Sequence, residues 1–350
     1  MQCSSQRAKD APGLGPHNNA VRYVAYDAPG DPSVLLVAQG PVPLPQRDEV
    51  LIEVEAAGVS RADTMQRQGR YPPPKGASPI LGLEVSGSIT QLGADVFNFS
   101  VGDRVVALCN GGGYAEYAAV PAGQVLPLPS QWSFVEGATL PENAFTVYDN
   151  LLVRAGLRAG QTALIHGGTS GIGTMAIMFT RAVRARAITT AGSEEKCRAT
   201  LEFGAEAAID YRNADFVDKV LEFTEKNGVD VVLDIVGGEY INRDLKALAT
   251  DGRVVCIAHA GGMESTIDLR YLIQRRAAIL GSSLRPRTSA EKAAIANGLR
   301  KDIWPLLPNR DPIFPVVDSV YTFSQAGEAH ARLESSRHIG KIVLVPDALP

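Results

Sequence analysis

The chain has 350 residues, of which 45% are hydrophobic and 21% charged, and its formal net charge is −4 at pH 7. This length suggests about two domains, each with its own core. The slightly acidic balance gives no overall attraction to phosphate backbones, so nucleic acid is not an expected partner.

The sequence indicates neither a membrane protein nor a protein of an oxidising compartment. No window reaches the roughly 20 uncharged apolar residues of a membrane helix, and the first twenty residues lack the apolar block of a signal peptide. We therefore expect a cytoplasmic protein with a disordered tail at residues 1–20 and no membrane partner. The sequence contains four cysteines and no CxxC pair, which argues against both a disulfide framework and a zinc site built from cysteines. We expect most of the four to be small buried hydrophobes: Cys3, Cys109, Cys197 and Cys256.

From Val21 to about Thr139 the chain consists of short β-type runs. They read "VLIEVEAAGV", "GLEVSGSITQLG", "VGDRVVAL" and "YAEYAAVP", and Gly and Pro fall between them at close intervals. This pattern is typical of a compact β-rich domain or a distorted barrel.

After Pro141 the pattern changes to alternating helices and strands. The run "NAFTVYDNLLVRAG" predicts a helix, and six apolar strands follow: "TALIHGG", "RAITTAG", "EAAID", "VDVVLDIVG", "GRVVCIA" and "AAILGSSL". Strands this apolar are covered on both faces, which predicts a doubly wound parallel sheet in an α/β domain. Helices between the strands are expected to start near these residues: Gly171, Ser193, Ala214, Tyr240 and Leu269.

Near Pro312 the chain leaves this pattern again. The runs "IFPVVDSVYTF" and "GKIVLVP" predict two more β segments, with the helix "FSQAGEAHARLES" between them. We assign these elements to the first domain. The predicted organisation is a discontinuous domain at 21–143 and 311–350 and a nucleotide-binding domain at 144–310.

The stretch "ALIHGGTSGIGT" joins the first of the six strands to its helix. Such a loop directs free N–H groups and the positive end of the helix dipole at one spot, which suits a pyrophosphate. The spacing is GxxGxG rather than GxGxxG, and the glycines could instead serve only close packing of strand on helix. The expected cofactor contacts are Gly168, Ser170, Gly171, Ile172 and Gly173. Ser170 is expected to be a helix N-cap, because its spacing does not fit a nucleophile elbow.

The end of the second strand indicates which dinucleotide is bound. An NAD site usually has an acidic residue there, but this strand ends in Gly192 and Ser193, which would not repel a 2'-phosphate. Lys196 and Tyr211 could supply a charge and a hydrogen bond to that phosphate. The two glutamates after Ser193 would favour NAD if either turned to the ribose, although glutamates in a first turn also serve the helix dipole. We predict NADPH.

Ten blocks, in the same order, resemble the zinc-independent quinone oxidoreductases of the medium-chain dehydrogenase/reductase superfamily. They read "GVSRADTMQRQGRYPPP", "LGLEVSG", "GDRVVAL", "GGGYAEY", "PENAFTVYDNL", "LIHGGTSGIGT", "TTAGSEEK", "LEFGA", "DVVLDIVGG" and "HIGKIVLV". The resemblance covers about residues 21–345. It implies a GroES-like β-rich domain, a Rossmann domain, NADPH in a cleft between them, and a homodimer.

The resemblance also implies that no metal takes part. Zinc-dependent relatives carry Cys and His in the blocks written here "GVSRAD" and "GLE", so Ser60 and Leu83 stand at the ligand positions. A catalytic zinc needs about three protein ligands, and a leucine cannot be one. The lobe that holds a second, four-cysteine zinc is absent from the sequence as well.

Without zinc or flavin, the hydride must come from the reduced nicotinamide, and the protein aligns it with an electron-poor acceptor. A hydroxyl donor could stabilise or protonate the oxyanion that forms. Tyr71 is the first candidate, since it matches a tyrosine that similar enzymes place near the substrate, although it could instead pack against the prolines after it. Ser60 is the second, at a position where similar enzymes tend to have Asn.

Other cofactor contacts follow from the resemblance. Thr146 matches a threonine near the nicotinamide carboxamide, although helix packing explains it equally well. Asp234 contacts the ribose or satisfies loop amides, and we favour the structural role. His259 lies in the loop that walls the nicotinamide, with Gly261, and is a weaker candidate for proton donor. The remaining candidates follow the sixth strand and would close the cofactor end of the cleft, although such an arginine is otherwise an ordinary surface charge: Leu284 and Arg285.

Three functions compete at this point. The first is NADPH-dependent reduction of a small quinone or enone. The second is reduction of an enoyl thioester, which uses the same hydride geometry. The third is a non-enzymatic NADPH-binding protein with a structural, sensing or RNA-binding role, and the acidic balance counts against RNA.

Overall fold

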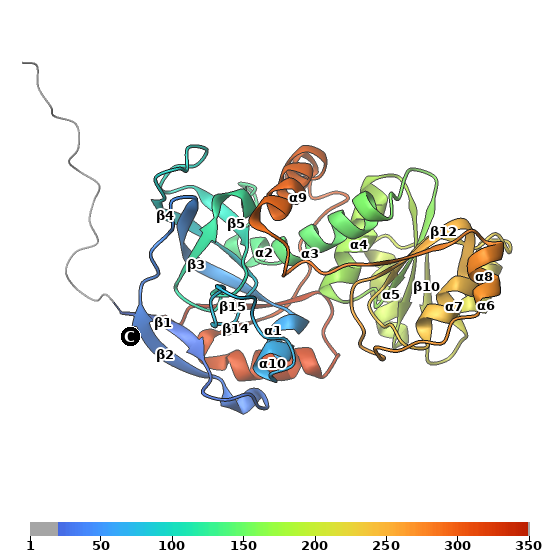
Figure 1. Ribbon diagram of the computed structural model, residues 1–350, viewed down its shortest axis with the longest axis horizontal. Coiled ribbons are helices and arrows are strands. Elements are labelled where there is room, and N and C mark those ends of the chain that lie inside the picture. The colour runs from blue at the N-terminus through green and yellow to red at the C-terminus, as the bar shows by residue number, and fades with distance from the viewer. Residues whose placement is uncertain (1–19, 349–350) are drawn as a thin grey trace, which may run out of the picture.

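The structure, a computed structural model, describes residues 20–348. The predicted tail therefore lies outside the described residues, apart from Ala20, which begins strand β1 (Ala20–Ala25). Figure 1 shows two lobes, one rich in β-structure and one built on a parallel sheet with helices on both faces. The predicted α/β fold class, with its β-rich and doubly wound parts, is confirmed.

The β-rich lobe is built on one seven-stranded sheet. Its strands run in the order β14-β15-β3-β4-β5-β7, and β6 pairs with β3. Their bounds are β3 (Glu49–Val59), β4 (Glu84–Leu92), β5 (Arg104–Leu108), β6 (Tyr117–Pro121), β7 (Val125–Pro127), β14 (Val317–Thr322) and β15 (Lys341–Val345). Because β15 pairs antiparallel with β3, the last strands of the chain lie in the same sheet as β3 to β7. The exact domain boundaries stay a prediction.

Short elements cover this sheet. β1 pairs antiparallel with β2 (Leu36–Pro41) in a separate ribbon. The helices are α1 (Arg61–Arg67), α2 (Phe134–Gly137) and α10 (Ala326–Glu334), with single turns η1 (Pro32–Val34), η2 (Ala122–Gln124) and η5 (Phe323–Gln325). Most of β3 is buried, and its exposed positions are Glu53 and Glu55, which explains why the rest of its sequence is largely apolar.

The second lobe has six parallel strands in the order β10-β9-β8-β11-β12-β13. They are β8 (Thr162–His166), β9 (Arg186–Ala191), β10 (Ala207–Asp210), β11 (Val229–Asp234), β12 (Leu248–Cys256) and β13 (Ala278–Gly281). The strand order reverses between β8 and β11. In sheets of this kind, dinucleotides bind at the carboxyl ends of the strands beside that reversal.

The helices of this lobe begin within two residues of their predicted starts. They are α4 (Gly171–Ala182), α5 (Glu194–Glu202), α6 (Phe216–Phe223), α7 (Tyr240–Ala247) and α8 (Leu269–Gln274). A side chain accepts a hydrogen bond from the first turn of α4, α5, α6 and α8. Such N-caps are the local signal that made the starts predictable.

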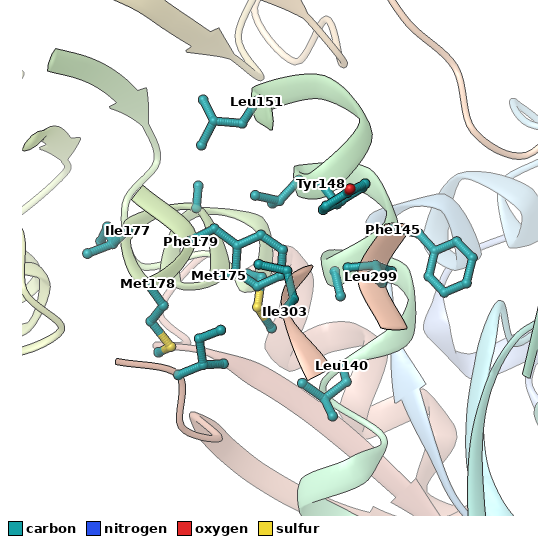
Figure 2. Packing of buried hydrophobic residues seen from close by; sticks show 14 of the residues in the cluster. Leu140, Phe145, Tyr148, Leu151, Met175, Ile177, Met178, Phe179, Leu299 and Ile303 are labelled. Carbon is teal, nitrogen blue, oxygen red and sulfur yellow. The ribbon is translucent and has the colours of Figure 1, made fainter. Parts of the chain in front are cut away.

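The helices at the junction of the lobes share one core with α4. The predicted helix "NAFTVYDNLLVRAG" is α3 (Pro141–Val147), continued by the π-helical segment η3 (Tyr148–Arg154). Together with α9 (Ser289–Asp302), followed by η4 (Trp304–Asn309), these segments pack around buried side chains that include Phe145, Phe179 and Leu299 (Figure 2). This packing fixes α3 against the helix that follows the glycine loop.

Candidate functional site

The glycine loop after β8 closes tightly on itself. Ser170 is the N-cap of α4: its Oγ accepts from the Gly173 amide at 3.0 Å and donates to the Gly167 carbonyl at 2.8 Å. A Cβ on Gly173 would lie 2.2 Å from that carbonyl oxygen, so no larger residue fits. Within residues 20–348, the amides of Gly171 and Ile172 have no intramolecular acceptor. The loop therefore offers two N–H donors at the positive end of a helix, an arrangement that binds phosphate.

The β-rich lobe contacts this loop directly. The Gly340 amide, just before β15, donates to the Thr169 carbonyl at 2.8 Å. A Cβ on Gly171 would lie 2.8 Å from Asn143 Nδ2 and 3.2 Å from Lys341 Cδ. Elements from both lobes therefore meet at the expected diphosphate position.

Gly192 and its neighbours form the expected adenosine end of the site. A Cβ on Gly192 would lie 2.9 Å from Tyr211 Oη and 3.5 Å from Arg212 Nε. Both side chains are exposed, Tyr211 by 42%. Ser193 is the N-cap of α5, so its hydroxyl serves the helix amides. Arg212 is a cation that the sequence reasoning missed; its position directly after Tyr211 was the available signal.

Lys196, expected to contact a 2'-phosphate, binds backbone carbonyls of the other lobe. Its ammonium donates to the Ser336 carbonyl at 2.7 Å and to the His338 carbonyl at 3.0 Å, in the segment between α10 and β15. Burial lowers the pKa of this ammonium. Two of its three N–H donors thus hold the lobes together, which leaves one for a ligand.

The loops after β11 and β12 are tied to each other. Asp234 is fully buried and accepts from the amides of Val236 at 2.6 Å and Gly237 at 3.0 Å, so its carboxylate organises the loop. The Gly261 amide donates to the Val236 carbonyl at 2.7 Å. His259, in the same loop, is exposed.

A buried charged cluster surrounds Ser60, the residue before α1. The Lys341 ammonium donates to Ser60 Oγ at 2.9 Å and lies 2.5 Å from Glu84 Oε1. Glu84 Oε2 accepts from the backbone amide of Glu142 at 3.0 Å. Lys341 is 5% exposed and Glu84 fully buried. Ser60, Glu84, Glu142 and Lys341 are therefore linked across four elements, and we call them the junction cluster.

Two carboxyls in this region have raised pKa values. Burial, reinforced by the charge of Glu84, raises the pKa of Glu142 to about 7. Burial also raises the pKa of Asp63 to about 6, although the amides of Ser60 and Gly82 donate to it at 2.8 Å and 2.9 Å and oppose that rise. The signals for these residues, a Glu four positions before Thr146 and an Asp three after Ser60, were present in the sequence.

Tyr71 lies beside a cation from the other lobe. The Arg285 guanidinium stands over the Tyr71 ring, 5.3 Å from its centroid, and its Nη2 donates to Gln66 Oε1 at 2.6 Å. The same Nη2 donates to the Asn110 carbonyl at 2.9 Å, and Lys292 bonds the Asn110 side chain. Arg285 thus bridges the two lobes next to Tyr71. Leu284, before it, is half-buried against the core at the junction.

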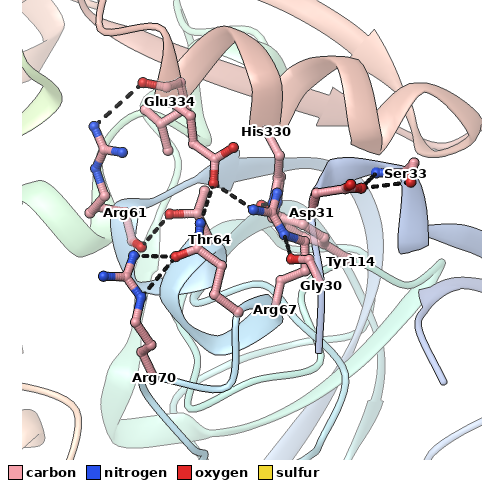
Figure 3. A network of polar contacts seen from close by, with 12 residues as sticks. Gly30, Asp31, Ser33, Arg61, Thr64, Arg67, Arg70, Tyr114, His330 and Glu334 are labelled. Atoms are coloured by element: carbon pink, nitrogen blue, oxygen red, sulfur yellow. Dashed lines mark hydrogen bonds and ion pairs between the residues drawn. The ribbon is translucent and has the colours of Figure 1, made fainter. Parts of the chain in front are cut away.

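A polar network fixes α1 and thereby Ser60 (Figure 3). Arg67 donates to the Gly30 carbonyl at 3.1 Å and to His330 Nδ1 at 3.3 Å, and it pairs with Glu334 at 2.5 Å. Burial lowers the pKa of His330 to about 3, so its ring is neutral. Its other nitrogen is then the donor to Tyr114 Oη, at 3.2 Å.

The side chains at the junction do not suit zinc. Leu83 is a buried hydrocarbon, and Lys341 places a positive charge next to Ser60. Within residues 20–348, no group of three or more His, Cys, Asp or Glu side chains is arranged to hold a metal. The glycine loop, in contrast, fits a dinucleotide diphosphate, because the amides of Gly171 and Ile172 at the start of α4 have no acceptor within residues 20–348.

The described helices include none with the length and apolar character needed to cross a bilayer. The cytoplasmic location stays a prediction.

Comparison with known families matches both lobes. Residues 46–130 match the alcohol dehydrogenase GroES-like domain, and residues 171–297 match a family described as zinc-binding dehydrogenase. The second match covers the nucleotide-binding lobe, whereas Ser60 and Leu83 belong to the first.

Individual proteins match over almost the whole chain. The quinone oxidoreductase of Rattus norvegicus is 33% identical over 319 residues, 90% of this chain and 95% of that protein. A phenolphthiocerol/phthiocerol polyketide synthase subunit of Mycobacterium tuberculosis is 31% identical over 94% of this chain, which matches 15% of that protein. A mycobacterial protein solved in complex with NADPH has a TM-score of 0.81 and 30% identity, covering 93% of this chain and all of that one.

Proposed function

Because the chain belongs to the medium-chain dehydrogenase/reductase superfamily and is an oxidoreductase of that family, we propose that it reduces quinones or related α,β-unsaturated carbonyls with NADPH, without zinc or flavin. The observation that carries this proposal is the junction cluster. A buried Lys341–Glu84 pair lies against Ser60, which stands at one of the two positions where zinc-dependent relatives carry a ligand. The chemistry left to such a site is direct hydride transfer assisted by hydrogen-bond donors.

Three features support NADPH as the cofactor. β9 ends without an acidic residue, so nothing at Gly192 repels a 2'-phosphate. Tyr211 and Arg212 flank that glycine, and Lys196 keeps one free donor nearby. A structural relative was solved with NADPH. Lys196 has only one donor left for the phosphate, because two carbonyls hold the others. Arg212 is exposed and is therefore the better candidate for the cation that binds the 2'-phosphate.

When bound, the reduced nicotinamide supplies a hydride. The protein's own groups orient the acceptor and stabilise the charge that develops on its oxygen. Ser60 Oγ accepts from the Lys341 ammonium at 2.9 Å, which polarises the hydroxyl, and its own proton reaches Glu84 Oε1 only at 3.5 Å, so it would turn from this long contact to donate to that oxygen. Tyr71, held beside Arg285, is the second hydroxyl donor.

The enoyl thioester alternative keeps specific support. The matched polyketide synthase segment spans 94% of this chain at 31% identity, and the same groups would serve an enoyl acceptor. Comparing kcat/KM on enoyl thioesters with kcat/KM on quinones separates the two substrates.

A direct assay tests the proposal. We expect NADPH oxidation with a small naphthoquinone, at a rate that chelators do not change. Binding of NADPH without turnover on any quinone or enone would contradict the proposal and favour a non-enzymatic nucleotide-binding role. Salt-dependent RNA binding in a shift assay would then be the next measurement.

We also propose a homodimer formed through β13. This strand is the last of the parallel sheet and has one neighbour, β12, within the described residues. The chain segment between β12 and β13 carries three exposed apolar side chains: Met263, Leu269 and Ile273 are 84%, 59% and 71% exposed. An open strand edge, together with exposed apolar residues in the segment that leads to it, suits pairing with a second copy.

A further inference from the structure

Glu142 and Thr146 lie on the same face of α3. They are four residues apart in one helix, Pro141–Val147, and residues at that spacing are neighbours about one turn apart. Thr146 is our proposed contact to the nicotinamide carboxamide. Glu142 therefore lies one turn from the expected reacting end of the cofactor, on the side of the junction cluster.

Glu142 differs from the other buried acids of this region. Glu84 is fully buried and paired with Lys341, and Asp63 is 1% exposed and accepts from the amides of Ser60 and Gly82. The Glu142 carboxyl, in contrast, has no hydrogen-bond or ion-pair partner within residues 20–348, and the residue is only half-buried. Of these three acids, Glu142 is therefore the one whose carboxyl is not already engaged by another group within residues 20–348.

Both acidic and basic side chains surround Glu142. Glu84 on β4 and Asp63 on α1 repel a second negative charge, whereas Lys341 on β15 and Lys292 on α9 attract it. The other titratable groups that sense its charge are Cys109, after β5, and Arg285, before α9. Cys109 is fully protonated near neutral pH, because burial raises the pKa of its thiol far above that range. Loss of the Glu142 proton is thus opposed by burial and two acids and assisted by three cations.

We propose that the Glu142 carboxyl is the proton donor in the reduction. This inference rests on the proposed function. The acceptor gains two electrons with the hydride, which forms a new bond to hydrogen as a π bond of the acceptor breaks. The oxyanion or enolate carbon that results then takes the Glu142 proton. Glu142 is left as a carboxylate, which the solvent reprotonates after product leaves.

The surroundings suit both states of this acid. Burial and the Glu84 charge keep the carboxyl protonated close to neutral pH, where a donor must carry its proton. Once the proton has left, Lys341 and Lys292 stabilise the carboxylate. Lys292 itself is a poorer donor, because its ammonium is held by the Arg285 carbonyl at 2.9 Å and by the Asn110 side chain.

The test compares Glu142→Gln with Glu142→Asp and with Glu328→Gln, an exposed acid in the first turn of α10. For wild type we expect kcat on a naphthoquinone to fall about tenfold per pH unit above the pKa of the donor. Glu142→Gln should lose about 10²-fold in kcat and the pH dependence together, with the Kd for NADPH within twofold of wild type. Glu142→Asp should keep a weakened pH-dependent limb, and Glu328→Gln should match wild type. A Glu142→Gln variant that keeps both kcat and the pH limb overturns the proposal.

A second measurement does not depend on turnover. Infrared difference spectra between wild type and Glu142→Gln, recorded with NADP⁺ bound, should contain a protonated carboxyl band at pH 6 that is lost by pH 8.5. Absence of that band at pH 6 overturns the donor role even if the wild-type protein reduces quinones. If the band is present but no quinone or enone is reduced, the proposed function is contradicted, whereas the conclusion that the Glu142 carboxyl is protonated at pH 6 remains.

Discussion

The Lys341 ammonium lies 2.5 Å from Glu84 Oε1 and joins β15, near the end of the chain, to β4 in its first third. Both side chains are buried. A buried ion pair of this kind adds little net stability relative to apolar residues, but loss of one partner leaves an uncompensated buried charge. Its value in this protein is to hold Ser60 and the Glu142 amide in place beside the glycine loop.

The first prediction follows from this pair. Lys341→Met should destabilise the protein by about 3 to 5 kcal/mol, because Glu84 is then buried without its cation. Adding Glu84→Gln should recover at least half of that loss. Denaturant midpoints of the two single variants and the double variant measure the coupling. Independent, additive losses would show that the pair does not act as a unit.

The second prediction concerns cofactor choice. Arg212→Ala should raise the KM for NADPH about tenfold and leave the KM for NADH nearly unchanged, because removing one charge-assisted contact to the 2'-phosphate costs about 1.4 kcal/mol. Lys196→Ala should instead affect both cofactors, since this ammonium also bonds the Ser336 and His338 carbonyls between the lobes. Equal effects of Arg212→Ala on both cofactors would place Arg212 outside the phosphate site.

The third prediction uses the raised pKa of Glu142. The pKa of this carboxyl rises from its ordinary value to about 7 on folding. Its contribution to the free energy of unfolding is therefore complete at pH values below the ordinary pKa and is lost as the pH rises toward 7. Glu142→Gln cannot ionise, so it should be more stable than wild type at pH 8, by about 1 to 3 kcal/mol, and equal to it near pH 4.5. Thermal unfolding at both pH values gives the comparison. A stability difference that does not change with pH would contradict the raised pKa.

Much of the fold could be predicted because its signals are local. The apolar runs of the parallel strands, and caps such as Ser170 and Ser193, are read within a few residues. The junction cluster could not be found in this way. Lys341 meets Ser60 across 281 positions of the sequence, and only the pairing of β15 with β3 brings the two together.

Lys196 illustrates a further limit of sequence reasoning. Its position a few residues after the end of the second strand predicted a contact with the 2'-phosphate. The carbonyls that engage its ammonium belong to a segment about 140 residues later, so spacing alone could not show that two of its donors are used. Glu142 was missed for a different reason: its spacing from Thr146 was visible in the sequence, but the burial and neighbouring charges that raise its pKa were not.

The fourth prediction tests the hydroxyl donor. Tyr71→Phe should lower kcat by about tenfold with little change in the KM for NADPH if the Tyr71 hydroxyl donates to the acceptor oxygen. The ring and its contact with Arg285 remain in this variant. Steady-state kinetics on a naphthoquinone provide the measurement, with Ser60→Ala as the companion variant. An unchanged kcat would assign Tyr71 to packing.

The fifth prediction concerns the open edge of the parallel sheet. Ile273→Asp places a charge on a side chain of α8, the helix before β13, that is 71% exposed, so it should not disturb the fold of one chain. If two copies pair at this edge, burying that carboxylate opposes association, and light scattering after size exclusion should report a shift from dimer to monomer at micromolar concentration. Phe97→Asp, at another exposed apolar residue on the β-rich lobe, is the control and should leave the dimer intact. A dimer that persists in Ile273→Asp but dissociates in Phe97→Asp would place the interface on the other lobe.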